Sequence, residues 1–479
     1  MSAKLKNPTL VLLTFLLAMP LTGCPANDKT HGMQQKVQQV QSGLQQIQQA
    51  GGDPRPIVQQ MKQVKVLLDR QDFQRADAKL DGILALIDNT LQDLSPALVA
   101  TDEVRSGHAC GAAPAKLSAS TICVKAPHEK IKIIGDAPRS GIFDPSIEYD
   151  TDGIGWLAYS AVFGDQAPFG PYVETHLAKS LDNGKSWQYV GKINESSEGT
   201  FKQSDGSVVE GNWNYEVSTL VYDPEDTGKE WKIFAHRALF LKNQKQGKPG
   251  NAHPYTLPSS TVVYRHAPHP AGPWSAAISL FHGKALPDSY ANDVRINLNK
   301  LHPDLSEHVV FSELGSVVVD GVLYLSLSAL KIDGSDQVIL LVSDDHAETW
   351  RYVGTLIKRS DAAMFGHHAF DGSSLVKLKK RLFLLASPMT RNNGANQYNG
   401  TLVFEIEDIS SAKLKRDDRG IPATYYYIEP NQSMWSGNGG GTADYDEQNT
   451  AGGIVMSQIS IKSAPEIFQV FNSKQNIIY

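Results

Sequence analysis

Four acidic residues in the long C-terminal part of the chain share one local setting. Each stands two positions before a small residue, at the head of an apolar run: Asp144, Glu216, Glu313 and Asp371. Carboxylates that crowd one pocket repel one another, so at least one pKa rises while another stays low. A protonated carboxyl facing an ionised one is the arrangement that cleaves a glycosidic bond. If the fold brings these side chains together, we predict that they are catalytic acids.

The same acids allow two other interpretations. The carboxylates could hold a cation or another ligand without catalysis, with His367 or His368 as a neutral ligand. They could also bind only the backbone of neighbouring sheets. For the glycosidase hypothesis, the candidate substrate-binding groups are Arg139, Arg237, Arg391 and His368. Because no H-E-x-x-H or comparable metal spacing occurs, we predict no metal site and no cofactor beyond a cation held by the acids.

The elements that must position these residues are short β-strands. From residue 125 onward, runs rich in Val, Ile, Tyr, Phe and Trp are separated by Gly, Pro, Asp and Asn, which is typical of an all-β fold. A turn and a second run follow each acid, at 155–160, 231–236, 322–328 and 381–387. A weaker fifth copy starts near Asp446 and leads into residues 452–456. We therefore predict five repeats, or six if one is hidden in residues 276–307.

Two octapeptides also repeat between strands. Residues 180–187 and 343–350 follow the pattern S-x-D-x-G-x-[TS]-W, with Ala347 where glycine is usual. In such a turn, serine and aspartate cap backbone N–H groups, glycine takes a positive φ, and tryptophan covers the apolar edge between sheets. We predict this structural role for Ser180, Asp182, Gly184, Trp187, Ser343, Asp345, Thr349 and Trp350. The segment Gly272-Pro273-Trp274 is the expected counterpart in another repeat.

With these motifs the chain resembles the sialidase-like β-propeller superfamily, whose blades carry Asp boxes (BNR repeats) in their outer hairpins. The resemblance implies a β-propeller over residues 125–479, with five blades favoured and six as the alternative. In a propeller the innermost strands line the axis, so the four acids would meet at one mouth of the channel. Five-bladed glycosidases similar to the arabinanases and fructosidases use inner-strand acids of this kind.

The resemblance to true sialidases fails at their arginine motif. Their first inner strand carries an arginine just before Ile-Pro, whereas this chain has Phe143-Asp144-Pro145, and the nearest arginine is Arg139. Sialic acid is therefore not the predicted substrate. The aromatic run at 425–427 is predicted to pack between blades rather than to supply a nucleophile.

The N-terminus carries an export signal. Lys4 and Lys6 precede a nearly apolar run over 10–21, which is too short to span a membrane. The run ends in Leu21-Thr22-Gly23-Cys24, which resembles a bacterial lipobox and implies a signal peptide over 1–23 and a lipidated Cys24. The mature protein would face the periplasm or the exterior, and the residue after the cysteine favours the outer membrane where one exists. Cys110 and Cys123 remain, and we predict a disulfide between them.

The segment between the anchor and the β region is helical in pattern. We predict a tether over 24–30, a helical spacer over 31–95 with three apolar stripes, and a linker over 96–124. A docking surface for a protein partner is the alternative function of the helices. The net charge of -6 offers no basic surface for nucleic acid.

These patterns predict a membrane-anchored, extracytoplasmic protein that acts on a glycan or another cell-surface ligand. A glycoside hydrolase is the leading hypothesis, and a propeller that binds a glycan or protein without catalysis is the alternative.

Overall fold

The chain forms two compact units, a helical unit within residues 1–107 and a β-rich unit from residue 108 onward. The computed structural model describes isolated positions between 33 and 47 and the ranges 54–70, 72–94, 117, 121–125, 128–163, 172–241, 257–331, 336–392, 395–430, 440–449, 452–459 and 465–477. The predicted signal peptide, Cys24, the tether and Cys110 lie outside the described residues.

The helical unit contains α3 (Arg55–Asp69) and α4 (Phe73–Leu94). Pro54 stands just before α3, where its fixed φ suits the start of a helix. The three apolar stripes share one core, formed by Met33, Val40, Leu44, Ile47, Ile57, Met61, Val64, Ala76, Leu80, Ile83 and Ile87. Of the helices that the structure describes, none combines the length and the apolar character needed to cross a membrane.

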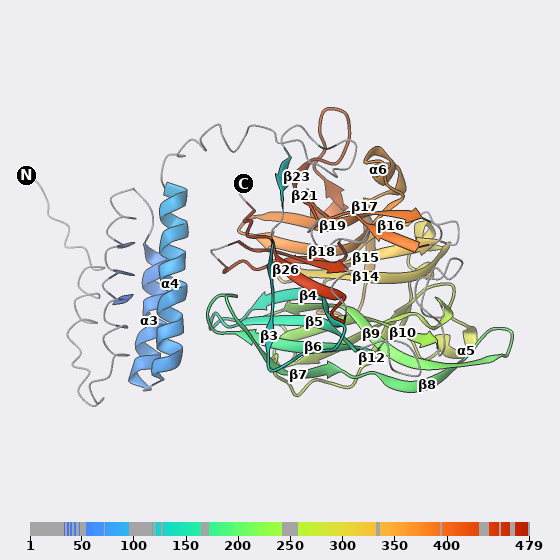
Figure 1. The fold of residues 1–479 in the computed structure, drawn as a ribbon, viewed down its shortest axis with the longest axis horizontal. Coiled ribbons are helices and arrows are strands. Elements are labelled where there is room, and N and C mark those ends of the chain that lie inside the picture. Colours follow the sequence, from blue (N-terminus) through green and yellow to red (C-terminus); the bar gives the residue numbers. More distant parts are fainter. Residues whose placement is uncertain are drawn as a thin grey trace, which may run out of the picture. The chain divides into compact units, whose positions relative to one another are not determined.

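The β-rich unit is built from groups of antiparallel strands that we number as blades (Figure 1). Blade I contains β4 (Gly141–Tyr149), β5 (Gly155–Phe163), β6 (Tyr172–Ser180) and β7 (Trp187–Asn194). Blade II contains β9 (Val208–Tyr222), β10 (Trp231–Leu241), β11 (Thr261–Ala267) and β12 (Ile278–His282), with β8 (Ser197–Lys202) and β13 (Ile296–Asn297) on its edges.

The other blades follow in chain order. Blade III contains β14 (His308–Val319), β15 (Val322–Lys331), β16 (Gln337–Ser343) and β17 (Arg351–Ile357). Blade IV contains β18 (Ala369–Leu378), β19 (Arg381–Asn392), β21 (Thr401–Asp408) and β23 (Thr424–Ile428), with β20 (Ala395–Tyr398) and β22 (Lys413–Leu414) beside them. Blade V contains β24 (Ala443–Tyr445), β25 (Ile454–Ile459) and β26 (Phe468–Asn472). Short helices α5 (Asp288–Ala291) and α6 (Arg359–Met364) lie in loops.

The first strands of the blades form a closed ring. They contact one another in the order β4, β9, β14, β18, β24 and back to β4. The fold is therefore a β-propeller with five blades among the described residues, as the sequence predicts. Residues 276–307 supply β12, α5 and β13 rather than the inner strand of a sixth blade. The sequence pattern placed the start of the fifth inner strand near Asp446, but this strand ends before Asp446. The sequence misplaced it because three residues are too few to show an alternating pattern.

The segment that precedes the first blade joins three blades together. Ile122–Val124 (β1) pairs with β23 of blade IV, Glu129–Lys130 (β2) pairs with β26 of blade V, and Ile133–Ile134 (β3) pairs with β7 of blade I. Cys123 on β1 is disulfide-bonded. Because its predicted partner lies outside the described residues, the pairing with Cys110 stays a prediction.

A buried histidine fastens the end of this segment to blade I. His176 is 2% exposed, and its Nδ1 and Nε2 lie 2.6 Å from Asp136 and 3.0 Å from Glu174. Burial alone would lower the pKa of His176, but the hydrogen bonds to the two carboxylates raise it above its ordinary value. Asp136 also accepts a hydrogen bond from Tyr159 at 2.7 Å. This carboxylate–imidazole–carboxylate group joins the residues after β3 to β5 and β6.

The outer hairpins of blades I and III make the bonds that the octapeptides predict. The Ser180 hydroxyl accepts a hydrogen bond from the Gly184 N–H at 2.9 Å, and Ser343 accepts one from the Ala347 N–H at 2.8 Å. Trp350 packs against Phe281 of blade II with ring centroids 5.4 Å apart. The indole N–H of Trp274 donates to the Pro270 carbonyl at 3.0 Å, as that of Trp350 does to Ala347 at 3.2 Å. The Trp274 turn thus resembles the Trp350 hairpin in one bond, from the indole to a carbonyl earlier in the same turn.

Candidate active site at the propeller axis

A β-bulge in each of four inner strands sets the direction of the acidic side chains. The register with the second strand shifts after Phe143, Glu216, Ser312 and Asp371. The next residue has a positive φ in every case: 51° at Asp144, 50° at Val217, 51° at Glu313 and 61° at Gly372. A bulge adds one unpaired residue and re-aims the side chains around it.

The bulges show that the four acids do not occupy one equivalent position. Asp144 and Glu313 are the first bulged residue of their strands, whereas Glu216 and Asp371 stand one residue earlier. The acid-x-small spacing in the sequence suggested full equivalence, and that part of the interpretation is wrong. The spacing does not reveal which residue of each strand is the extra one.

The structure nevertheless brings the four carboxyl groups together. Burial raises the pKa of Glu313 well above the ordinary value, and the next largest causes are the charges of Asp371, Asp144 and Glu216. The acid of the fifth inner strand, Asp444, is not among the charges that act on Glu313. Instead, Thr442 beside β24 donates its hydroxyl hydrogen bond to Asp144.

Asp144 is the most enclosed of the four acids. It is 5% exposed and accepts hydrogen bonds from the Ser160 hydroxyl at 2.8 Å and the Val217 N–H at 3.2 Å, in addition to Thr442. Burial raises the pKa of Asp144 to about 6, against the lowering effect of the hydroxyl groups. Its carboxyl therefore links blades I, II and V and leaves little room for a substrate atom.

Glu313 has the opposite character. Its side chain is only partly buried, and among the described residues no group donates a hydrogen bond to its carboxyl. Burial and three neighbouring carboxyl groups hold its pKa well above the ordinary value, which favours the protonated form. It is the acid best placed to donate a proton.

Glu216 and Asp371 each contact a side chain from another strand. The Glu216 side chain is 23% exposed and lies 3.1 Å from His236 Nδ1, while the other ring nitrogen of this buried histidine lies 2.6 Å from the Ser260 hydroxyl. Asp371 accepts a hydrogen bond from the Tyr398 hydroxyl at 3.1 Å. Burial, and then the charges of Asp371 and Glu313, raise the pKa of Tyr398 well above its ordinary value, so it remains a donor.

Tyr398 is a site residue that the sequence did not indicate. It lies on β20, a short strand with no recognisable pattern, and the pairing of β20 with β19 places it opposite Met389. Likewise, nothing in the sequence marks His236 as a partner of Glu216. Both follow from strand pairing.

The predicted substrate-binding groups lie at several places around the same strands. Arg139 is exposed in the turn before β4, and His368 is exposed just before β18. Arg237 is on β10, directly after His236, and Arg391 is on β19, where its side chain lies outside the described residues. Burial, and then the charge of His368, lower the pKa of His367 to about 4, so its ring is neutral at physiological pH.

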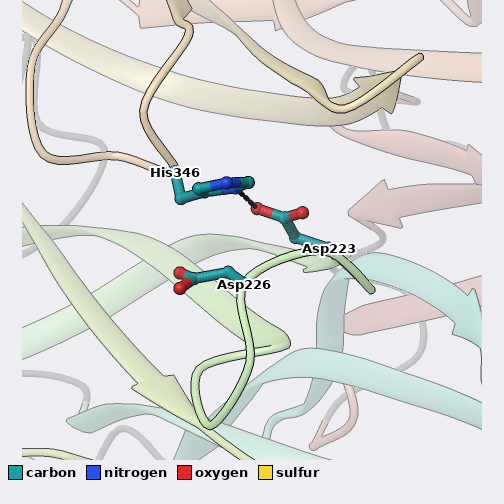
Figure 2. Close-up of side chains that lie close together, drawn as sticks. All are labelled: Asp223, Asp226 and His346. Atoms are coloured by element: carbon teal, nitrogen blue, oxygen red, sulfur yellow. Dashed lines mark hydrogen bonds and ion pairs between the residues drawn. The ribbon is translucent and has the colours of Figure 1, made fainter.

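A second cluster of titratable groups lies where the β9–β10 turn of blade II meets the outer hairpin of blade III. Asp223, Asp226 and His346 bring their ligand atoms within 4.8 Å of one another, and His346 Nδ1 is 2.9 Å from Asp223 (Figure 2). The fully buried Lys232 ammonium, however, lies 2.9 Å from Asp223 and 2.8 Å from Asp226. The lysine already neutralises these acids, so we interpret the cluster as a structural ion pair. The four axial acids do not form such a three-ligand group within the described part of the chain.

The axial channel continues beyond the acids. A cavity of about 180 Å³ is lined by later residues of the inner strands, including segments 146–149, 316–318 and 375–378. Burial raises the pKa of Asp444 in its wall to about 7. The hydroxyl and carboxyl groups here also join blades, since Asp444 accepts hydrogen bonds from the Ile147 N–H at 2.7 Å and Ser374 at 3.1 Å.

No protein-family model and no curated protein sequence matches this chain. Among solved structures, it is similar to an exo-beta-1,3-galactanase from Clostridium thermocellum, with 11% identity, a TM-score of 0.41, and 72% of this chain and 61% of that one covered. A family 117 glycoside hydrolase from Zobellia galactanivorans gives 13% identity and a TM-score of 0.41, over 74% and 92% of the two chains. A Hadza microbial sialidase gives 12% identity and a TM-score of 0.37, with 68% of this chain and 57% of the sialidase covered. The chain thus spans less than two thirds of the galactanase and of this sialidase, and these likenesses concern the fold.

Proposed function

We propose that this protein is a glycoside hydrolase in which Glu313 donates the proton to the glycosidic oxygen. The observation that carries the proposal is the convergence of four carboxyl groups, which together with burial raises the pKa of Glu313 well above its ordinary value. Hydrolysis of a glycoside needs a protonated carboxyl and an ionised one on either side of the bond. A carboxyl that accepts no hydrogen bond from the described residues can orient toward the leaving oxygen.

Glu216 and Asp371 are the candidates for the ionised partner. Each is accessible in part, and each is oriented by one side chain, His236 or Tyr398. The partner either deprotonates water or attacks the anomeric carbon directly. Asp144, whose oxygens already accept three hydrogen bonds, would instead raise the pKa of Glu313 through its charge.

Variants at the three accessible acids test the proposal. The full chain is first screened on a panel of aryl glycosides, and hydrolysis of the best substrate is then measured for Glu313→Gln, Glu216→Gln and Asp371→Asn. Loss of a general acid or base lowers the rate by roughly 10²- to 10⁴-fold. Azide, which can take the place of a missing carboxylate, should restore turnover in the variant that lacks the ionised partner. If all three variants keep the wild-type rate, the acids are not catalytic.

The environment of Asp144 favours a second candidate, a propeller that binds a glycan or protein without catalysis. Its carboxyl is used to join neighbouring blades, which is a structural task. Binding of a glycan by the wild-type chain without hydrolysis of any aryl or natural glycoside would support this candidate.

We also propose that the chain is a lipoprotein, anchored through Cys24 and spaced from the membrane by its helices. The lipobox sequence supports the anchor, and the octapeptide turns support the Asp-box interpretation. Metabolic labelling with a radioactive fatty acid should mark the wild-type chain and not the Cys24→Ser variant. Labelling of both would contradict the anchor.

A further inference from the structure

The inner strand of blade II extends farther beyond its acid than the inner strands of the other blades do. Its inner strand β9 begins at Val208, eight positions before Glu216, whereas β4 begins at Gly141, three positions before Asp144. At about 3.3 Å per residue, β9 extends roughly 16 Å farther beyond the acids than β4 does. Strand β8 and the last residues of β10 pair with this extension, so it is a three-stranded wall. Figure 1 shows it as the long green hairpin that ends near α5.

The wall has a small core of its own. Phe201, Leu239 and Leu286 are buried there, with Trp213 and Tyr290 packed against them. The rings of Phe201 and Tyr290 stack with centroids 4.7 Å apart. The wall is therefore an ordered element that can hold a side chain in a fixed position.

Arg237 lies where this wall meets the acids. It is paired with Tyr215 across the two strands and directly follows His236, the partner of Glu216. Its guanidinium carbon lies 3.8 Å from the centre of the Trp213 ring and 5.9 Å from that of Tyr215. Stacking on aromatic faces orders the guanidinium and leaves its N–H donors available.

Arg237 differs from other described arginines in the surroundings of its charge. Within the described ranges, no carboxylate pairs with it, whereas carboxylates pair with Arg381, Arg416 and Arg419. Four acids at the axis would repel an anionic substrate unless a fixed cation attracted it. A guanidinium matches the geometry of a carboxylate or a sulfate, to which it donates two parallel hydrogen bonds.

We infer that the β8–β10 wall is a substrate subsite for an acidic glycan, in which Arg237 binds the carboxylate or sulfate of one sugar while the bond to be cleaved lies at Glu313. This inference rests on the proposed function, because it assumes that a glycan occupies the axial acids. It names the substrate class of the same site. Trp213 and Tyr215 are positioning residues whose rings fix the orientation of the guanidinium.

The test compares binding of acidic and neutral glycans by the full chain. An array carries the same oligosaccharides in neutral, carboxylated and sulfated forms, and the Glu313→Gln variant is used so that bound glycan is not consumed. Adding Arg237→Ala should weaken binding of the acidic forms by roughly 10- to 100-fold relative to the neutral forms, the value expected for charged hydrogen bonds. Arg237→Lys should give an intermediate loss, because a single point charge replaces the planar fork.

The matched control is Arg351→Ala, which removes the same charge from exposed strand β17 of blade III and should leave the array pattern unchanged. Thermal unfolding of each variant shows whether the wall is still folded. A preference for the carboxylated or for the sulfated forms identifies the source of the anion. A wild-type preference for neutral forms, or an equal loss for all forms in Arg237→Ala, would overturn the subsite.

The two proposals can fail separately. Hydrolysis of neutral glycans without an acidic preference would remove the subsite and leave the glycosidase. Binding of acidic glycans that depends on Arg237, without hydrolysis, would remove the glycosidase and leave the subsite. Absence of both binding and hydrolysis would remove both.

Discussion

Replacing Glu313 with glutamine is expected to lower activity and raise stability at the same time. The amide keeps the shape of the carboxyl group but cannot donate a proton to a leaving oxygen. A general acid contributes roughly 10²- to 10⁴-fold to a rate, so hydrolysis of the best aryl glycoside should fall by that factor. If Glu313 had only a structural role, its replacement would lower the stability of the protein instead.

The expected gain in stability follows from the raised pKa of Glu313. Burial, and then the charges of three acids, raise the pKa of Glu313 in the folded protein. The folded protein therefore still binds a proton at a pH where the unfolded chain, with the ordinary pKa of 4.5, has released it. Below that pH both states are protonated, so the substitution should change little. As the pH rises, ionisation favours the unfolded state, so wild-type stability falls while the variant does not share this loss. The advantage of the variant should therefore grow with pH until the folded carboxyl ionises.

Thermal unfolding followed by circular dichroism measures this difference at several pH values. Every 1 kcal/mol of gain would raise the melting temperature by about 2 to 4 °C in a domain of a few hundred residues. Glu307→Gln is the control, since Glu307 is exposed and paired with Lys284 just before the same strand, and it should leave the melting temperature nearly unchanged. A Glu313→Gln variant that is less stable than the wild type, or equally stabilised at every pH, would refute the reasoning.

Three further predictions concern stability. Gly184→Ala should destabilise by at least about 2 kcal/mol, because a Cβ at φ +73° would lie 1.7 Å from a carboxylate oxygen of blade V; Gly206→Ala, with φ +84° and open space, should cost only about 1 kcal/mol in the same melts. The contribution of His176 should be complete below pH 6.5 and decrease as the pH rises through its raised pKa, so urea unfolding of His176→Asn should differ most from the wild type on the acid side of that range; a difference that grows with pH would contradict this. Lys232→Met should lower the free energy of unfolding by about 3–5 kcal/mol, because it leaves buried Asp223 without the lysine cation. A chelator should not change the melting temperature of the wild type. A shift on chelation would show that the cluster holds a metal.

Much of the architecture could be predicted from the sequence because it depends on local pattern. The apolar runs at 155–160 and 322–328 form second strands as predicted, because nearly every residue of β5 and β15 is buried and both faces of each strand must therefore be apolar. The octapeptide turns also form as predicted, because their hydrogen bonds join residues four positions apart. The fifth inner strand was located less well, because three residues between glycine-rich and acidic segments carry no periodic signal.

The sequence by itself determined which acids lie on the inner strands of four blades, and hence the set of carboxyl groups at the axis. Only the tertiary structure decided their individual environments. It determined which strand carries its extra residue at the acid, that Thr442 from the far end of the chain encloses Asp144, and that no described residue donates a hydrogen bond to Glu313. It also decided that Tyr398 and His236 contact the site and that Lys232 fills the outer acidic cluster. The physical reason is that spacing along a strand records which residues are polar, whereas a pKa depends on burial and on charges that arrive from other blades.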